Sequence, residues 1–392
     1  MVVPFFYLNF AASQTNNTLN TTQMKTILSL ACALWLVAAP AYSQISPSQE
    51  EHSTFKAFNQ LDMGVTLGTT GVGVELASPI GEYMQLRAGF SFMPHFHYPM
   101  HFHVQVGDDP ATSESKFNSL ASKLEEFTGY KAKNEVEVTG VPTYYNFNML
   151  VDFYPFKRSK HWRLTAGFYL GPKKIAKAYN VTEAMTSLLA VNIYNSIYDK
   201  IENGEPIYEN LHFPPEYEEK ILSYGRMGIH IGDFVDRYAK EHAIDEGGFW
   251  LYDDDGNPVF QDKLDANGNK VHQPYMVVPD DDGMVKASMF VNRFKPYVGI
   301  GYDGRLDKMN DRLKIGFDCG VMFWGGVPQV ITQAKMRDID PYCDVEDRDI
   351  LVDVDLTRDV ENIRGKVGTY VDVAKKFKVF PVLNLRLAYT LF

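Results

Sequence analysis

Four of the ten histidines lie between residues 95 and 103, and imidazole is a common ligand of zinc and copper ions. Side chains two residues apart on an extended chain project to the same side. One hypothesis is therefore a Zn²⁺ or Cu²⁺ site built from His95, His97, His101 and His103. The alternative is that these are polar residues at the outer end of a strand, because a metal site usually requires three or four converging ligands with supporting contacts.

Other candidate motifs indicate turns and not catalysis. Three Asp/Asn-Gly segments resemble calcium loops, but the residue five positions before each glycine is not an acid, so we expect turns at 253–257, 265–269 and 280–283. No serine stands in a nucleophile elbow beside the histidines, so a catalytic serine–histidine pair is not predicted. We therefore expect neither an enzyme nor a cofactor, apart from the metal hypothesis above.

A second set of ionisable residues recurs at alternate positions of eight segments whose other positions are apolar. None of the 37 apolar-side positions is charged, although 22% of the chain is. Many glycines are interleaved with the ionisable residues, and they leave room for opposed charges in a crowded interior. Because buried charges require partners, we expect pairing among Asp62, Glu75, Arg87, Asp152, Arg163, Asp303, Lys314, Asp318 and Arg386.

Strands must position these nine residues, because the alternation has a period of two. The predicted strands are 61–68, 72–77, 84–92, 145–154, 162–171, 296–303, 313–324 and 383–391. An unbroken apolar outer face is a large exposed patch in water, whereas lipid requires it and a closed barrel satisfies its backbone there. The sequence therefore predicts an all-β fold, an eight-stranded antiparallel transmembrane β-barrel with the charges in its lumen.

The connections between these strands alternate in length. Three are short, at 78–83, 155–161 and 304–312, and three long inserts of about 93–144, 172–295 and 325–382 leave from the opposite rim. Outer-membrane barrels have short periplasmic turns and long external loops. We therefore expect both chain ends in the periplasm and the inserts outside the cell. Helical spacing is expected at 113–127, 182–201 and 357–376, so the inserts should fold into an α/β cap.

Composition excludes several classes of protein. The net charge of −11 argues against nucleic acid as a partner, because phosphate contacts need a basic surface. A mean hydropathy of −0.23 is too polar for a bundle of membrane helices, each of which needs about 20 apolar residues. Three cysteines cannot form a disulfide scaffold.

The start of the chain has the layout of an export signal, but the layout begins at Met24. Lys25 supplies a basic start, an apolar run follows, and small residues precede Gln44. We expect 1–43 to comprise an upstream segment and a signal peptide at 24–43, with Met24 as the true start. The mature barrel would then occupy 44–392.

Two segments carry a resemblance to known proteins: KPYVGIGY at 295–302 and the terminal FPVLNLRLAYTLF at 380–392. They resemble the small eight-stranded outer-membrane barrels of the OmpA/OmpX/OmpW type, in the form with large external inserts common in Bacteroidota. The resemblance implies location in the outer membrane of a Gram-negative bacterium, with outer-membrane lipid around the barrel. It also implies that the aromatic end of the closing strand is read by the barrel-assembly machinery.

Function is less specified than architecture. An eight-stranded barrel is just wide enough for side chains to fill it, so paired charges should close the lumen. The leading hypothesis is a non-enzymatic outer-membrane barrel that displays a folded cap for a structural role, adhesion or ligand capture. The alternatives are a narrow porin-like channel or small-molecule conduit, and metal capture at the histidines. The sequence names no extracellular ligand or partner.

Overall fold

The computed structural model describes residues 58–107, 109–129, 132–156, 160–202, 204–245, 247, 251–254, 259–306, 312–340, 343, 346–363, 365–376 and 378–392. The predicted signal peptide at 24–43 and the start at Met24 lie outside the described residues, as does part of the expected turn at 253–257.

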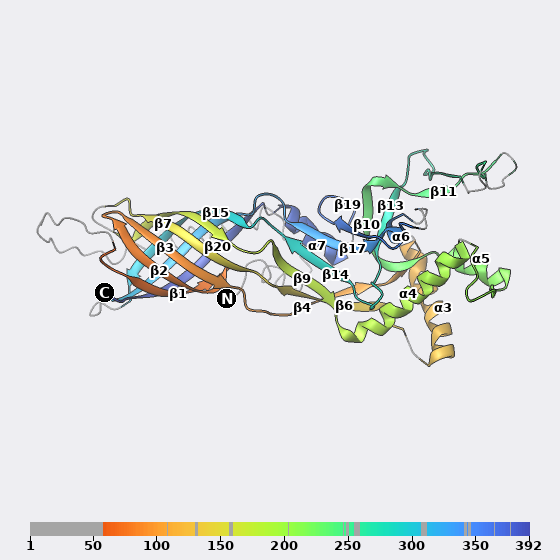
Figure 1. Ribbon diagram of the computed structural model, residues 1–392, viewed down its shortest axis with the longest axis horizontal. Helices are drawn as coiled ribbons and strands as arrows, with labels where there is room; N and C mark the ends of the chain where they lie inside the picture. Colours follow the sequence, from red (N-terminus) through yellow and green to blue (C-terminus); the bar gives the residue numbers. More distant parts are fainter. Residues whose placement is uncertain are drawn as a thin grey trace, which may run out of the picture.

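Eight antiparallel strands form a closed barrel at one end of the molecule (Figure 1). In barrel order they are β1 (Asp62–Gly68), β2 (Gly71–Gly81), β3 (Met84–Phe92), β7 (Tyr145–Phe153), β8 (Trp162–Leu170), β15 (Phe294–Arg305), β16 (Leu313–Phe323) and β20 (Val379–Thr390). Pairing of β1 with β20 closes the cylinder. Each of these strands coincides with a predicted one to within a few residues, so the predicted eight-stranded antiparallel barrel is confirmed.

Burial alternates along the barrel strands as the period of two requires. In β7, for example, Asn146, Asn148 and Asp152 are buried, whereas Phe147 and Phe153 are exposed on the outside. The exposed positions of the barrel strands are apolar, apart from Arg305 at the end of β15 next to a short turn. The outer face is therefore apolar, and the charged side chains of the sequence analysis lie in the lumen.

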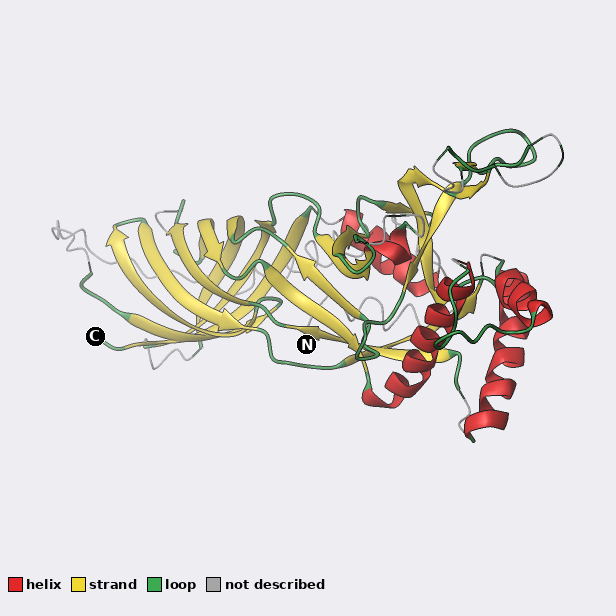
Figure 2. Ribbon diagram, turned by 45° about the vertical axis from the view of Figure 1, so that its right-hand side comes forward, coloured by secondary structure: helices red, strands yellow, loops and turns green. Residues whose placement is uncertain are grey.

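Three long connections, between β3 and β7, β8 and β15, and β16 and β20, form the other end of the molecule, here called the cap (Figures 1 and 2). The first contains β4 (Tyr98–His103), β5 (Gln105–Val106), α3 (Pro110–Thr128) and β6 (Glu135–Pro142). The second contains β9 (Lys174–Asn180), α4 (Thr182–Glu202), α5 (Pro215–Tyr224), β10 (Met227–Tyr238), β11 (Lys240–His242), β12 (Phe260–Asp262), β13 (His272–Val277) and β14 (Lys286–Phe290). The third contains β17 (Gln329–Lys335), α6 (Met336–Ile339), β18 (Leu351–Asp355), β19 (Val360–Glu361) and α7 (Gly365–Lys376).

The main sheet of the cap extends the wall of the barrel. Its strand order is β18-β17-β14-β9-β6-β4, and the last five of these strands adjoin β16, β15, β8, β7 and β3 in the chain, which are barrel neighbours in the same order. A bulge at Ile175 interrupts the pairing of β9 with β14, since Phe290 pairs with Lys174 but Met289 pairs with Ala176. Such a bulge moves the following side chains to the other face, and it brings Ala176 and Ala178 to the apolar side of the sheet.

A second, smaller sheet and several helices cover that apolar side. β10 pairs with β13, β19 and β5, and its Ile229 and Ile231 belong to the core of the cap, together with Leu188 of α4 and Val371 of α7. Among the described residues, no helix is both long and apolar enough to cross a membrane.

Two of the three predicted cap helices are found, and the third is shorter than expected. α3 and α4 occupy the predicted stretches 113–127 and 182–201, whereas the helix predicted for 357–376 begins only at Gly365. The Asp355 carboxylate accepts hydrogen bonds from the backbone N–H of Thr357 at 3.0 Å and from its hydroxyl at 2.6 Å. This turn leads into β19, so the helix starts after it.

Candidate functional site

The four candidate histidines lie along one exposed stretch of the chain. His95 and His97 precede β4, His101 and His103 lie on it, and all four are exposed. His101 Nδ1 lies 3.2 Å from Glu135 Oε1. Within the described part of the chain, no group of three or more His, Cys, Asp or Glu side chains could hold a metal ion.

Arg87 lies at the centre of the charged lumen. Its guanidinium is fully buried and contacts three carboxylates, those of Glu75 at 3.2 Å, Asp152 at 2.7 Å and Asp318 at 3.0 Å. Since several strands supply these acids, Arg87 ties together β2, β3, β7 and β16 across the lumen. A guanidinium suits this position because its planar fork can bond several acceptors at once.

Arg163 and Arg386 extend the same network toward the rim with the short turns. Arg163 Nη2 lies 2.8 Å from Asp318 Oδ1, its Nε 3.5 Å from Asp152 Oδ1, and it also pairs with Asp303. Arg386 Nη2 lies 2.9 Å from Asp303 Oδ1. Charges are therefore shared, and no acid in the network depends on a single base.

Lys314 and Asp62 form a separate pair at 2.8 Å nearer that rim. The structure thus brings all nine lumen residues of the sequence analysis into ion pairs: seven in one network and two in this pair. Seven of the nine are buried, and the exceptions are Asp303 and Lys314.

Glycines make the space for these side chains. A Cβ added at Gly301 would stand 2.6 Å from Arg163 Nε, and one added at Gly316 would stand 2.5 Å from Asp303 Oδ1. Both distances are shorter than real contacts allow, so a larger residue would push on a guanidinium or carboxylate that several ion pairs already hold. The glycines of the lumen face are therefore part of the charged network.

Neutral residues on the same face complete the network, although only their alternation could have identified them in the sequence. The Thr165 hydroxyl donates to Asp152 Oδ1 at 2.7 Å, and Asn148 Nδ2 donates to Glu75 Oε1 at 3.1 Å. The Tyr154 hydroxyl lies 3.1 Å from Asp303 Oδ2. Two of these acceptors, Asp152 Oδ1 and Asp303 Oδ2, also contact Arg163, so the hydroxyl groups add to the ion pairs.

Above the charged layer, on the side of the cap, an aromatic layer fills the lumen. Tyr169 and Tyr297 meet edge to face with centroids 5.5 Å apart, and Trp324 stacks on Phe380 at 5.1 Å. With their apolar neighbours these rings form one buried cluster: Leu150, Tyr169, Ile175, Val291, Tyr297, Met322, Trp324, Phe380 and Val382. Ion pairs and packed rings therefore occupy two successive layers of the lumen.

Lys295 lies at the cap side of the aromatic layer. The strand pattern predicted a start at 296, but β15 begins at Phe294, so Lys295 belongs to the lumen and not to the insert 172–295. It is 1% exposed, its Nζ donates to Asn146 Oδ1 at 3.1 Å, and no ion pair of the described residues includes it. A small cavity of about 10 Å³ lies beside the two side chains, room for about one water molecule.

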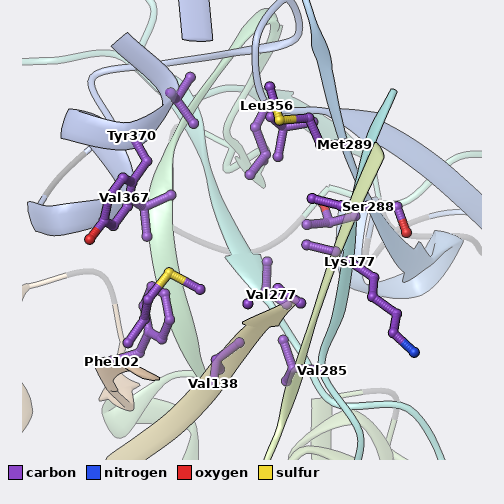
Figure 3. A pocket seen from close by; sticks show the side chains of 18 of the residues that line it. Phe102, Val138, Lys177, Val277, Val285, Ser288, Met289, Leu356, Val367 and Tyr370 are labelled. Atoms are coloured by element: carbon purple, nitrogen blue, oxygen red, sulfur yellow. The ribbon is translucent and has the colours of Figure 1, made fainter. Parts of the chain in front are cut away.

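The cap contains a larger cavity of about 210 Å³. β4, β6, β9, β14 and β17 line one side, and β10, β13 and α7 the other, with α7 contributing Val367, Tyr370, Val371 and Ala374 at helical spacing. Figure 3 shows Phe102, Val138 and Val285 around a common space, while the Lys177 amine points away from it. Met289 also packs against the aromatic cluster of the lumen, so this cavity lies next to the closed barrel.

Small residues form the floor of this cavity. Gly140 of β6 pairs with Ala178 of β9, which pairs with Ala287 of β14, which pairs with Thr332 of β17. The row crosses four adjacent strands without a large side chain. A hollow therefore remains between this row and the covering elements.

Polar groups at the cavity already have partners. Thr332 Oγ1 lies 2.7 Å from the Tyr275 hydroxyl, and the Tyr370 hydroxyl donates to that of Tyr98 at 3.2 Å. Burial and this contact raise the pKa of Tyr370, which keeps the phenol neutral. The lining thus directs no charged group into the cavity, and it offers few polar groups that could hydrogen-bond to water.

Comparisons with known proteins give only distant matches. No family model matches the sequence, and no curated protein matches it. Among solved structures, the fold is similar to two crystal structures from Acinetobacter baumannii. CarO2 has a TM-score of 0.32 and 11% identity over 86% of this chain and 100% of that chain, and CarO has 0.30 and 12% over 84% and 96%.

A third similar structure is a major outer membrane protein from Thermus thermophilus. The TM-score is 0.25 and the identity 10%, over 84% of this chain and 98% of that chain. The assignment of a closed barrel comes from the strand pairing described above.

Proposed function

We propose that this protein is a non-enzymatic outer-membrane barrel whose closed lumen anchors a folded cap outside the cell. The outer face of the barrel supports the membrane location: Val65, Leu76, Phe90, Phe147 and Leu385 are among the large apolar side chains that it exposes. A continuous apolar band on a closed barrel matches the needs of lipid and not of water. Outer-membrane lipid is then the direct partner of this face, and the barrel-assembly machinery would act on β20.

The proposal that the barrel is closed rests on two layers of side chains that fill the lumen. Ion pairs around Arg87 occupy one layer, and rings around Tyr297 occupy the next. A conducting pore would need a continuous water path through both. The barrel then serves as an anchor, and recognition falls to the cap.

Planar-bilayer recordings of the refolded full-length protein test this proposal, with a general porin in the same bilayers as the positive control. We expect no stable conductance steps. Reproducible single-channel steps would instead favour the alternative, a narrow channel or small-molecule conduit.

Cysteine labelling on intact cells tests the orientation. Long connections on one rim and short turns on the other support an external cap and periplasmic ends. In a Cys319→Ser/Cys343→Ser background, we expect an impermeant maleimide to label Asp282→Cys in the cap and not Lys160→Cys at the opposite rim. Labelling of Lys160→Cys alone would reverse the orientation.

A further inference from the structure

We propose that the cavity between the main cap sheet and α7 binds an uncharged aliphatic chain. This assignment rests on the proposed function, in which the external cap carries recognition, and it names the kind of ligand that the cap would bind. Its basis is the lining: valine, isoleucine, methionine and aromatic side chains surround about 210 Å³, more than the roughly 150 Å³ that suffices for benzene in an engineered apolar cavity.

The shape of the site favours a chain over a compact polar ligand. The floor is the row of small residues Gly140, Ala178, Ala287 and Thr332, which crosses the sheet from strand to strand. A methylene chain lying along such a row would contact the sheet below and α7 above. A polar ligand would lose its hydration without gaining partners, because the hydroxyls of Tyr370 and Thr332 are already hydrogen-bonded.

The chain could come from a free amphiphile or from a lipid of the adjacent bilayer. In both cases the recognised chemistry is the same, an uncharged hydrocarbon segment with its polar group outside the cavity. Lys177 does not supply a charge inside, since its amine is directed away from the space (Figure 3).

Methionine methyl groups provide a direct readout, because Met100 and Met289 both line the cavity. The full-length protein, labelled with ¹³C at the methionine methyls and held in lipid nanodiscs, is titrated with 1-decanol. We expect saturable shifts of these two resonances. A second arm uses nanodiscs doped with a phospholipid that carries a spin label near its chain end, where broadening of the same two resonances would identify the bilayer as the source.

Variants separate binding in the cavity from general partitioning. Ala287→Phe fills the floor and should weaken decanol binding about tenfold or more, and Ala178→Leu does the same from the next strand should the first variant fold poorly. The matched control is Gln333→Leu, which adds an apolar side chain to the exposed face of the same sheet and should leave binding unchanged.

Absence of both decanol shifts and spin-label broadening would overturn the cavity assignment, as would shifts that persist in the filled variants. The outcome is independent of the conductance test. If the methionine resonances shift saturably but the barrel conducts in planar bilayers, only the closed-barrel proposal is overturned. If the barrel does not conduct and the resonances do not shift, only the ligand site is overturned.

Discussion

The barrel lumen and the cap cavity adjoin each other along the same strands, yet side chains fill the first and leave the second hollow. In the lumen, small residues stand opposite large ones: Gly301 faces Arg163, and Gly316 faces Asp303 and Arg386. In the cap, Gly140 stands beside Ala178, and only ordinary contacts surround it. Glycines occur in both interiors. An interior is filled where large side chains face its glycines, and it stays hollow where other small residues lie beside them.

This difference separates stability from recognition. A filled interior gains packing and ion pairing but offers no room to a ligand. A hollow interior gives up packing and keeps room. The filled interior of the barrel and the hollow interior of the cap should therefore respond in opposite ways to substitutions that add a side chain.

Removing the central base should have the largest effect. Arg87→Met leaves the buried acids Glu75, Asp152 and Asp318 with fewer partners, and we expect the free energy of unfolding to fall by about 3–5 kcal/mol. Urea unfolding of the refolded protein in vesicles, followed by tryptophan fluorescence, measures it.

The control is Lys314→Met in the pair nearer the short turns. The Lys314 side chain is 27% exposed, and Asp62 keeps hydrogen bonds from Gln60 and Thr390, so the loss should be clearly smaller. Equal losses in the two variants would show that the Arg87 network has no special weight in the barrel.

A single added methyl group should have the next largest effect. Gly301→Ala places a Cβ against the Arg163 guanidinium, which three carboxylates hold in place, and we expect a loss of about 1–3 kcal/mol. Gly304→Ala in the same strand meets nothing closer than 3.6 Å and should stay within about 0.5 kcal/mol of the wild type. Thermal unfolding of the two variants side by side tests the filled-lumen description, which fails if they are equally stable.

The barrel could be predicted from the sequence because each of its strands can be recognised from the alternation of residue types within that strand. Eight segments alternate with a period of two, and each places its charge on the face opposite its apolar residues, so Arg87 and Asp318 could be assigned to one interior without knowing which strands pair. The particular pairs could not be predicted, since they depend on tilt and register. Lys295 was missed because β15 begins two residues before the predicted start.

The cap was less predictable because its sheet depends on pairing between strands that are far apart in the sequence. Its main sheet joins short strands from three inserts, and the bulge at Ile175 changes the face of β9 just after the strand begins. Beyond β3, the parity also reverses: Phe90 is on the outer face of the barrel, but Phe102 packs into the cap, and the intervening histidines point to solvent.

Removing the unpaired lysine should have an effect of opposite sign to that of Arg87→Met. Among the described residues, the partner of Lys295 is the neutral Asn146, and the surrounding side chains are mostly apolar. Replacing both, as Lys295→Met/Asn146→Leu, removes a buried amine without orphaning its acceptor, so we expect the free energy of unfolding to rise by about 1 kcal/mol. The same urea experiment measures it, and a loss as large as that of Arg87→Met would contradict the neutral environment.

The smallest effect should come from adding a methyl group to the hollow interior. A Cβ at Gly140 would meet the Met100 methyl at 3.4 Å and the Tyr98 carbonyl at 3.7 Å, both ordinary contacts, and the backbone there is not in the left-handed region. Gly140→Ala should therefore raise the free energy of unfolding by about 0.4–1 kcal/mol, because alanine loses less conformational entropy on folding. The matched comparison is Gly301→Ala, the same chemical change in the filled interior. Opposite signs for the two variants in thermal unfolding are the expected result, and a destabilised Gly140→Ala would mean that the cap is as tightly packed as the lumen and has no room for a chain.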